Sequence, residues 1–347
     1  MTLALTLALT LTAFAGEVTW VGGGHAGNPQ WSPDGAWLAF EVNNNADKVD
    51  FYVVKVANGN ASAPQKVVIP GGSSSFSVGG SYAANPNWHP RGPVLFEAAN
   101  PGGLTRIYFL SPGGSSPAEY LSVAQAPGNL AWPTISPDGT TLAFTSSATG
   151  QGDVYAFSQA TNKVYVTMST DIPENAPRFS PDGKVLVFSK KNQGTEDLFT
   201  HTFGTSVQTP LKGGSGDQSR PRFAKSDIIY FTNERGDEHW DIAAIPSAGG
   251  ERRVVAQDIR LPLRSQPSLT PDSSAVLYTS SAPAKDSSVY VTKLDGTGTK
   301  EIKTGLSAVG DASLVTAAGR SFLAFTALPT SGSDWRQLHI IDVTGQF

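Results

Sequence analysis

Five arginines fall in one stretch of the chain, each at or just before an expected strand. They are Arg178, Arg220, Arg222, Arg260 and Arg264. A guanidinium group offers paired N–H donors that match a carboxylate or a phosphate. If the fold gathers these side chains, they would attract a small anion or an acidic peptide terminus. The alternative is simple pairing with nearby carboxylates, because surface charges often do no more than that. The candidate carboxylates are Asp171, Glu174, Asp217 and Asp258.

The segment 233–240 is the most charged of the chain and is a candidate contact surface for a partner protein. The side chains concerned are Glu234, Arg235, Asp237, His239 and Trp240. Variable loops on a rigid scaffold commonly carry binding sites. The alternative is a solvated loop without a partner.

The sequence offers no set of residues for catalysis. It has five histidines and no cysteine, so thiolate metal sites and cysteine nucleophiles are excluded. The histidines are scattered over different parts of the chain, whereas a metal needs ligands that converge on one point. We therefore expect no catalytic residues, no metal site and no cofactor.

Strands rather than helices must position these side chains. The 347 residues include 36 glycines and 24 prolines, a density that interrupts long helices and suits short strands joined by turns. The chain is 39% hydrophobic and 16% charged, with a net charge of −4. These values are typical of a globular protein and argue against a disordered chain or a basic nucleic-acid binder.

An internal repeat organises the chain. The leading prolines of six copies stand at positions 29, 86, 133, 177, 221 and 267, and a degenerate seventh copy starts at Ala312. Three copies contain Ser-Pro-Asp-Gly, in which proline fixes φ, aspartate bonds to the backbone and glycine takes a positive φ. A ring closes the second hydrophobic run of every copy. These rings are Phe40, Phe96, Phe144, Phe188, Phe231, Tyr278 and Phe325.

Each copy predicts three strands and most predict a fourth, weaker one. Four antiparallel strands in a unit of about 45 residues are the signature of a β-propeller blade. We expect an all-β fold, a seven-bladed propeller over residues 17–347, with six blades as the alternative. The run 17–21 precedes the first copy, and the last copy lacks its fourth strand, so pairing of the two ends would close the ring. We expect open loops on one face at 43–48, 71–84, 190–196, 233–239 and 331–335.

The first sixteen residues, MTLALTLALTLTAFAG, predict a secretory signal peptide cleaved after Ala15. The run is shorter than the ~20 apolar residues that a membrane span needs. We expect a periplasmic or secreted protein without a membrane span.

The Ser-Pro-Asp-Gly turns, with a preceding aromatic residue and a following Asp-[Ile/Val/Leu/Phe]-[Tyr/Phe] strand, resemble the propeller repeats of the periplasmic protein TolB and of prolyl oligopeptidases. The resemblance covers residues 28 to about 342. Only residues 1–27 precede the first copy, so we do not expect the small α/β domain of TolB. The chain also has no G-x-S-x-G elbow, so we expect no peptidase domain.

This resemblance implies an exported, monomeric and non-enzymatic scaffold. It would bind another envelope or extracellular protein, and neither nucleic acid nor a cofactor. A glycan- or small-anion-binding propeller is the alternative. Oligogalacturonate lyase is similar in its repeats and implies a metal-dependent enzyme, for which this chain offers His25 with Gln30, Gln218 or Gln266.

Overall fold

The computed structural model describes residues 16–19, 23–45, 48–70, 82–114, 116–167, 171–203, 205–262 and 264–346. These residues form strands and turns, with one 3₁₀ turn, η1 (Pro283–Lys285), and no α-helix among them. The all-β class is confirmed. The expected signal peptide, residues 1–15, and Trp20 lie outside the described residues. No helix in the described part of the chain is long and apolar enough to cross a bilayer.

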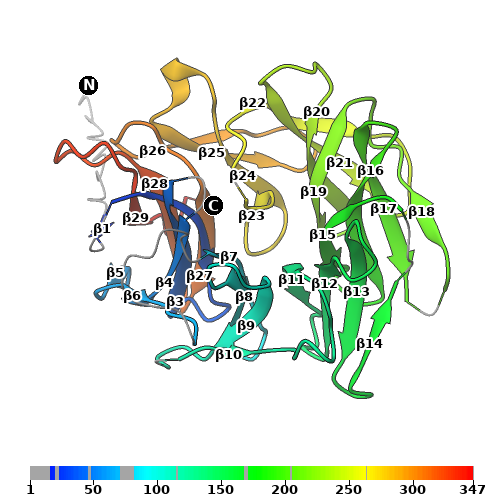
Figure 1. Ribbon diagram of the computed structural model, residues 1–347. Helices are drawn as coiled ribbons and strands as arrows, with labels where there is room; N and C mark the ends of the chain where they lie inside the picture. Colours follow the sequence, from blue (N-terminus) through cyan, green and yellow to red (C-terminus); the bar gives the residue numbers. More distant parts are fainter. Residues whose placement is uncertain are drawn as a thin grey trace, which may run out of the picture.

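Consecutive strands of each copy pair as antiparallel hairpins (Figure 1). The first two copies supply β2 (His25–Trp31), β3 (Trp37–Asn45), β4 (Lys48–Ala57), β5 (Asn60–Ala61), β6 (Gln65–Lys66), β7 (Tyr82–Trp88), β8 (Val94–Ala99), β9 (Arg106–Leu110) and β10 (Ala118–Glu119). The third and fourth supply β11 (Leu130–Ile135), β12 (Thr141–Ser146), β13 (Asp153–Ser158), β14 (Lys163–Val166), β15 (Glu174–Phe179), β16 (Val185–Asn192), β17 (Thr195–Thr202) and β18 (Gln208–Pro210). The fifth to seventh supply β19 (Asp217–Ala224), β20 (Asp227–Asn233), β21 (Trp240–Pro246), β22 (Arg253–Ile259), β23 (Ser268–Leu269), β24 (Ala275–Thr279), β25 (Ser288–Lys293), β26 (Lys300–Lys303), β27 (Ala312–Ala317), β28 (Arg320–Ala327) and β29 (Gln337–Asp342).

The two ends of the described chain pair in one sheet. Strand β1 (Gly16–Val18) runs antiparallel to β29, with Val18 opposite Leu338, in the order β1-β29-β28-β27. Figure 1 shows these first and last strands side by side at the left of the ring. The expected pairing of the termini is therefore confirmed.

The number of blades stays a prediction. The described strands form six sheets, one of which has nine strands and combines the first two copies. Dividing this sheet at its one parallel bridge, between Val49 and Tyr82, gives seven sheets in all, of which six have four strands and one, β2 to β6, has five.

Two expected loops are wrong. Strand β3 continues to Asn45 and β4 starts at Lys48, which lies opposite Asn45, so most of the loop expected at 43–48 is strand. Strands β16 and β17 continue to Asn192 and from Thr195, so a two-residue turn replaces most of the loop expected at 190–196. Gln193 and Gly194 have φ values of 51° and 99°, as the tight hairpin turns that match strand twist require.

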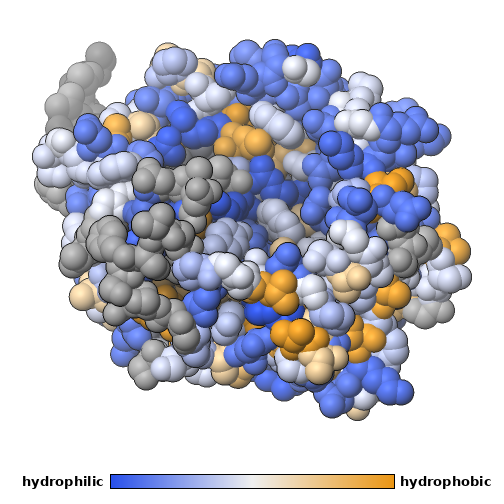
Figure 2. Space-filling view, in the orientation of Figure 1, coloured by the Kyte–Doolittle hydropathy of each residue, from blue (hydrophilic) through white to orange (hydrophobic). Residues whose placement is uncertain are grey.

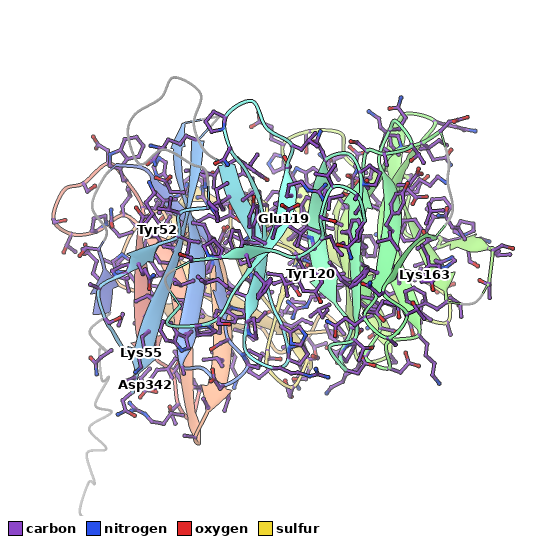
Figure 3. The ribbon with its side chains drawn as sticks, turned by 60° about the horizontal axis from the view of Figure 1, so that its bottom comes forward. Tyr52, Lys55, Glu119, Tyr120, Lys163 and Asp342 are labelled. Atoms are coloured by element: carbon purple, nitrogen blue, oxygen red, sulfur yellow. The ribbon has the colours of Figure 1, made fainter. Side chains whose placement is uncertain are left out.

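The core consists of ring stacks repeated from copy to copy. Six of the seven rings that close the second hydrophobic run are at most 2% exposed. In the first copy Phe40 stacks on Tyr52 with centroids 5.4 Å apart, and Phe96 stacks on Tyr108 at 6.0 Å in the second. Figure 3 shows Tyr52 within its blade, whereas Lys163 lies on an outer strand. Burial of these rings supplies much of the hydrophobic stabilisation of each blade.

The Ser-Pro-Asp-Gly turns form the bonds that their sequence predicts. In the third copy Ser136 donates its hydroxyl proton to Asp138 and accepts the N–H of Thr141 at 2.9 Å. The bond from Ser136, followed by the N–H of Thr140, holds the pKa of Asp138 below its ordinary value. The aspartates thus serve as turn residues in the described structure.

Replacing Ser136 with alanine should lower the free energy of unfolding by about 1 to 2 kcal/mol, because two backbone donors and one carboxylate lose a buried partner. Asp138 has a lowered pKa in the folded chain, so its stabilisation is complete above the ordinary pKa and is lost as the pH falls through the lowered value. Urea unfolding at pH 7 and pH 3 measures both effects. The variant should also lose less stability on acidification than the original chain, and an equal acid loss would contradict this account.

Candidate functional site

The inner ends of several blades surround a polar cavity of about 120 Å³. Strands β2 and β7 contribute amide side chains to its wall, β15 and β19 contribute Arg178 and Arg222, and the loop before β23 contributes Arg264. The amides are Asn28, Gln30, Asn85 and Asn87. Figure 2 shows hydrophilic residues around the hollow near the middle of the ring. A cavity of this size has room for several waters or one small ion.

The backbone around each leading proline directs these side chains. Residues before the prolines have left-handed conformations: Asn28, Asn85, Trp132, Ala176 and Arg220, with φ values from 48° to 55°. At each of these positions the first strand shifts register against the second, as in a β-bulge. Bulges change the direction of side chains next to binding sites. The residue after the proline lines the cavity in four copies: Gln30, Asn87, Arg178 and Arg222.

Arg178 and Arg222 face the cavity without an ion pair to any carboxylate of the described residues. Arg178 donates to the carbonyl of Pro177 at 2.8 Å, and Arg222 donates to that of Pro267 at 3.3 Å. Burial, followed by the repulsion of Arg222, lowers the pKa of Arg178 to about 9. Burial also lowers the pKa of Arg222. Burial and the charge of Arg222 thus disfavour the charged form of Arg178, and the buried Glu97 carboxylate acts in the opposite direction.

The carboxylates expected to neutralise these arginines have other partners. Glu174 pairs with Lys190 at 3.5 Å, and Asp258 pairs with Arg235 at 3.0 Å. Asp217 accepts the backbone N–H of Glu196 at 3.0 Å. Simple pairing with Glu174 or Asp258 therefore does not explain the two cavity arginines.

Arg264 is placed differently, because it links its loop to the first copy. Its Nη1 donates to Asn43 Oδ1 at 2.7 Å and lies 3.4 Å from Glu41 Oε2. Its guanidinium also lies over the ring of Tyr82, 5.7 Å from the centroid. Arg264 thus connects the lining of the cavity to β3 of the first copy.

Arg220 and Arg260 do not line the cavity. Arg220 donates to the carbonyls of Pro262 and Ser265 at 2.8 and 2.9 Å and lies over the ring of Phe231. Arg260 lines a separate, smaller hollow beside Asp311. Of the five arginines proposed from the sequence, the structure brings three to the cavity and places two behind it.

Glu41 is a buried carboxylate that sequence analysis did not single out. It is 1% exposed and accepts Asn28 Nδ2 at 2.7 Å and the N–H of Asn85 at 2.9 Å. Burial raises its pKa to about 7, although Arg264 and these donors act in the opposite direction. Glu41 therefore joins the innermost strands of the first two copies to the Arg264 loop.

Glu97 and Asp311 likewise accept hydrogen bonds that connect one copy to the next. Glu97 accepts the hydroxyl of Tyr82 and the N–H of Trp132, the latter at 2.6 Å. Asp311 accepts the N–H of Asn28 at 2.6 Å. Burial raises the pKa of both carboxyl groups.

A sequence signal for two of these acids exists within the repeat. Glu41 and Glu97 directly follow the ring of their copy, a position that holds a hydroxyl residue in the other five. Those residues are Thr145, Ser189, Thr232, Thr279 and Thr326. A carboxylate at a repeat position that otherwise holds Ser or Thr would have indicated an unusual contact between neighbouring copies.

The segment 233–240 carries charges that are paired. Arg235 binds Asp241 at 3.1 Å and Asp258 at 3.0 Å, and Glu234 pairs with Arg252. Asp237 contacts His239 Nδ1 at 3.0 Å. His239 is exposed and the Trp240 ring packs partly against the core. Glu234, Arg235 and Asp237 of this segment therefore have partners within the fold.

Metal ligands do not converge in the described part of the chain. No group of three or more His, Asp or Glu side chains there could hold a metal ion. His25 accepts the N–H of Arg336 at 3.1 Å and packs against Trp335. Gln30 and Gln266 line the cavity, whereas His25 and Gln218 do not.

Comparison with solved structures finds propellers. The chain superposes on TolB from Acinetobacter baumannii with a TM-score of 0.55 and 15% identity, covering 90% of this chain and 65% of that one. Oligogalacturonate lyase from Vibrio parahaemolyticus superposes with a TM-score of 0.60 and 12% identity, covering 96% of this chain and 92% of the lyase chain. A puromycin-hydrolyzing peptidase from Mycobacterium tuberculosis superposes with a TM-score of 0.63 and 13% identity, covering 96% of this chain and 56% of the peptidase chain. The chain therefore spans less than two thirds of the TolB and peptidase chains, and these likenesses show the fold alone.

No curated protein matches the chain. A model of the TolB beta propeller domain matches residues 118–314, which is more than half of the chain. This protein is a member of the TolB beta propeller domain family.

Proposed function

We propose that this protein is an exported, non-enzymatic binding propeller that holds another protein of the envelope or extracellular space, and that Arg178 and Arg222 receive a carboxylate of that partner. The observation that carries the proposal is the pair of half-buried guanidinium groups facing one cavity without a carboxylate partner among the described residues. A half-buried guanidinium group without an ion pair attracts an anion, so a bound carboxylate would be stabilised there. The surrounding amides of Gln30 and Asn87 add neutral donors for the remaining lone pairs.

Export is the part of the proposal that rests on the apolar run of residues 1–15 in the sequence. Cleavage after Ala15 would leave the strand that pairs with β29 intact. N-terminal sequencing of the mature protein from a secreting host tests this part of the proposal.

The anion site is tested by calorimetric titration with inorganic phosphate, succinate and a tetra-aspartate peptide. Arg178→Ala and Arg222→Ala should each weaken binding about tenfold or more, since each removes a charge-assisted contact worth ~1.4 kcal/mol or more. Arg178→Lys should recover only part of the affinity, because an ammonium group lacks the paired donors.

Arg320→Ala is the matched control, because Arg320 is an exposed arginine whose partner is Asp342, outside the cavity. It should bind all three probes as the unaltered chain does. Absence of saturable anion binding, or equal losses in Arg320→Ala and Arg178→Ala, would refute the anion site. A pull-down in which Arg235→Ala alone abolishes capture would move the partner contact to the 233–240 loop.

A further inference from the structure

A second hollow of about 580 Å³ lies between the fifth and sixth copies, away from the arginine cavity. One wall is β22, from which the consecutive residues 254–258 all contribute. The other wall includes Tyr278 of β24 and Tyr290 of β25, with Lys285 and Thr299 at the rim. We call this hollow the β22 groove. Its volume is within the range of small-molecule sites.

The groove is open because β22 departs from regular pairing. Its ladder with β21 shifts register twice, and Asp258 near its end has a φ of 50°. Each end of the stretch 254–258 nevertheless contacts the sixth copy. At one end Ser281 donates its N–H to the Asp258 carbonyl at 2.9 Å. At the other, Gly296 lies so close that an added Cβ would be 3.1 Å from the carbonyl oxygen of Val254. The stretch 254–258 is thus held against the sixth copy at both of its ends.

The sequence changes at the position that forms the floor of this groove. Six copies have phenylalanine as the ring after the second hydrophobic run, and all six are buried. The sixth copy has Tyr278, which is half-buried and stacks on Tyr290 with centroids 5.5 Å apart. The Tyr278 hydroxyl accepts a bond from Thr292 at 3.3 Å and donates none to any other described residue. Its proton is therefore available to a ligand in the groove.

The chemistry of the walls is mixed and nearly neutral. Aromatic and aliphatic surfaces come from Tyr278, Tyr290 and Val255, and polar groups at the edges come from Gln257 and Ser280 among others. The two charged side chains of the lining, Asp258 and Lys285, have opposite signs, and Asp258 is already paired with Arg235. A ligand that fits has one apolar face for the rings and several hydroxyl groups for the rim.

We propose that the β22 groove binds a neutral saccharide, with a pyranose ring against the tyrosine pair and its hydroxyls bonded to Tyr278 and the polar rim. This site does not depend on the proposed anion site. The wall of five residues, 254–258, spans only about 13 to 17 Å at ~3.3 Å per residue, so the bound portion is one or two sugar units.

The test is titration of the full chain with the disaccharides maltose, cellobiose and chitobiose, followed by calorimetry and saturation-transfer NMR. At least one of these probes should bind saturably. Ala282→Trp, which places a large ring in the groove, should abolish that binding. Tyr290→Ala should weaken it about tenfold or more through loss of ring contact, and Tyr278→Phe by about two- to tenfold through loss of one hydrogen bond.

Tyr278→Phe installs the residue that the other copies carry, so its fold should be unaffected and thermal unfolding checks this. Tyr155→Ala, at the same repeat position as Tyr290, controls for the loss of a stacked ring and should leave binding unchanged. Arg178→Ala should also bind the saccharide normally. Failure of all three probes to bind, or binding that persists in both Ala282→Trp and Tyr290→Ala, would overturn the proposal.

Discussion

Replacing Glu41 with alanine should lower the free energy of unfolding by about 3 to 5 kcal/mol, because buried groups lose their partner. Asn28 Nδ2 and the N–H of Asn85 would have no acceptor, and Arg264 would lose the carboxylate 3.4 Å away. This is a large part of the ~5–15 kcal/mol that stabilises an ordinary domain. Urea unfolding followed by tryptophan fluorescence measures the loss.

Glu41→Gln separates the charge from the hydrogen bonds. The folded pKa of Glu41, about 7, lies above its ordinary value of 4.5, so its stabilisation is complete below the ordinary value and declines as the pH rises through 7. The corresponding change is about 3 kcal/mol for the unaltered chain. In the Gln variant this decline should be absent between pH 5 and pH 8. Stability that falls equally in both chains over this range would show that another group titrates.

Thr145→Ala provides the matched control for Glu41→Ala, because Thr145 follows the ring of its own copy and donates to the Ala131 carbonyl at 3.2 Å. Loss of this single neutral bond should cost about 1 kcal/mol. If Glu41→Ala and Thr145→Ala were equally destabilising, the Glu41 carboxylate would not hold the first two copies together.

Replacing Val18 with aspartate should have the second large effect, because Val18 is 2% exposed and packs in the cluster that contains Leu338 and Ile340. A carboxylate buried there without a partner should cost about 3 kcal/mol or more. Loss of β1 would also expose the edge of β29, which is a template for pairing with another chain. We expect a lower Tm in calorimetry together with self-association in size-exclusion chromatography.

Glu17→Lys is the control for Val18→Asp, since Glu17 is exposed on the same strand opposite His339. It should change the free energy of unfolding by less than about 0.5 kcal/mol. A Val18→Asp chain that melts at the temperature of the Glu17→Lys chain and stays monomeric would show that β1 is dispensable for closure.

The binding proposals and the stability predictions concern separate residues. Glu41 and Glu97 lie behind the cavity and hold its strands, whereas Arg178 and Arg222 face it. Variants of the acids should therefore act first on unfolding, and variants of the arginines on anion affinity. Glu41 also bonds Asn28 and Asn85, which line the cavity, so anion titration of the Glu41 variants should be compared with that of Arg178→Ala.

Much of the fold follows from local sequence. The period of the leading prolines, the turn chemistry around Asp138 and the ring series each act within a few residues, so the strands, their hairpins and the stacked core could be predicted. The pairing of β1 with β29 was also predictable, because one strand was surplus at one end and one was missing at the other.

Contacts between distant copies could be decided only by the tertiary structure. Arg264 and Glu41 are 223 positions apart, and no local pattern indicates that Arg264 would reach Glu41 in β3. The same applies to Arg220, which binds backbone carbonyls instead of facing the cavity. The β22 groove depends on two register shifts and the left-handed Asp258. Repeats determine what each copy forms by itself, whereas the path of each loop depends on packing against its neighbours.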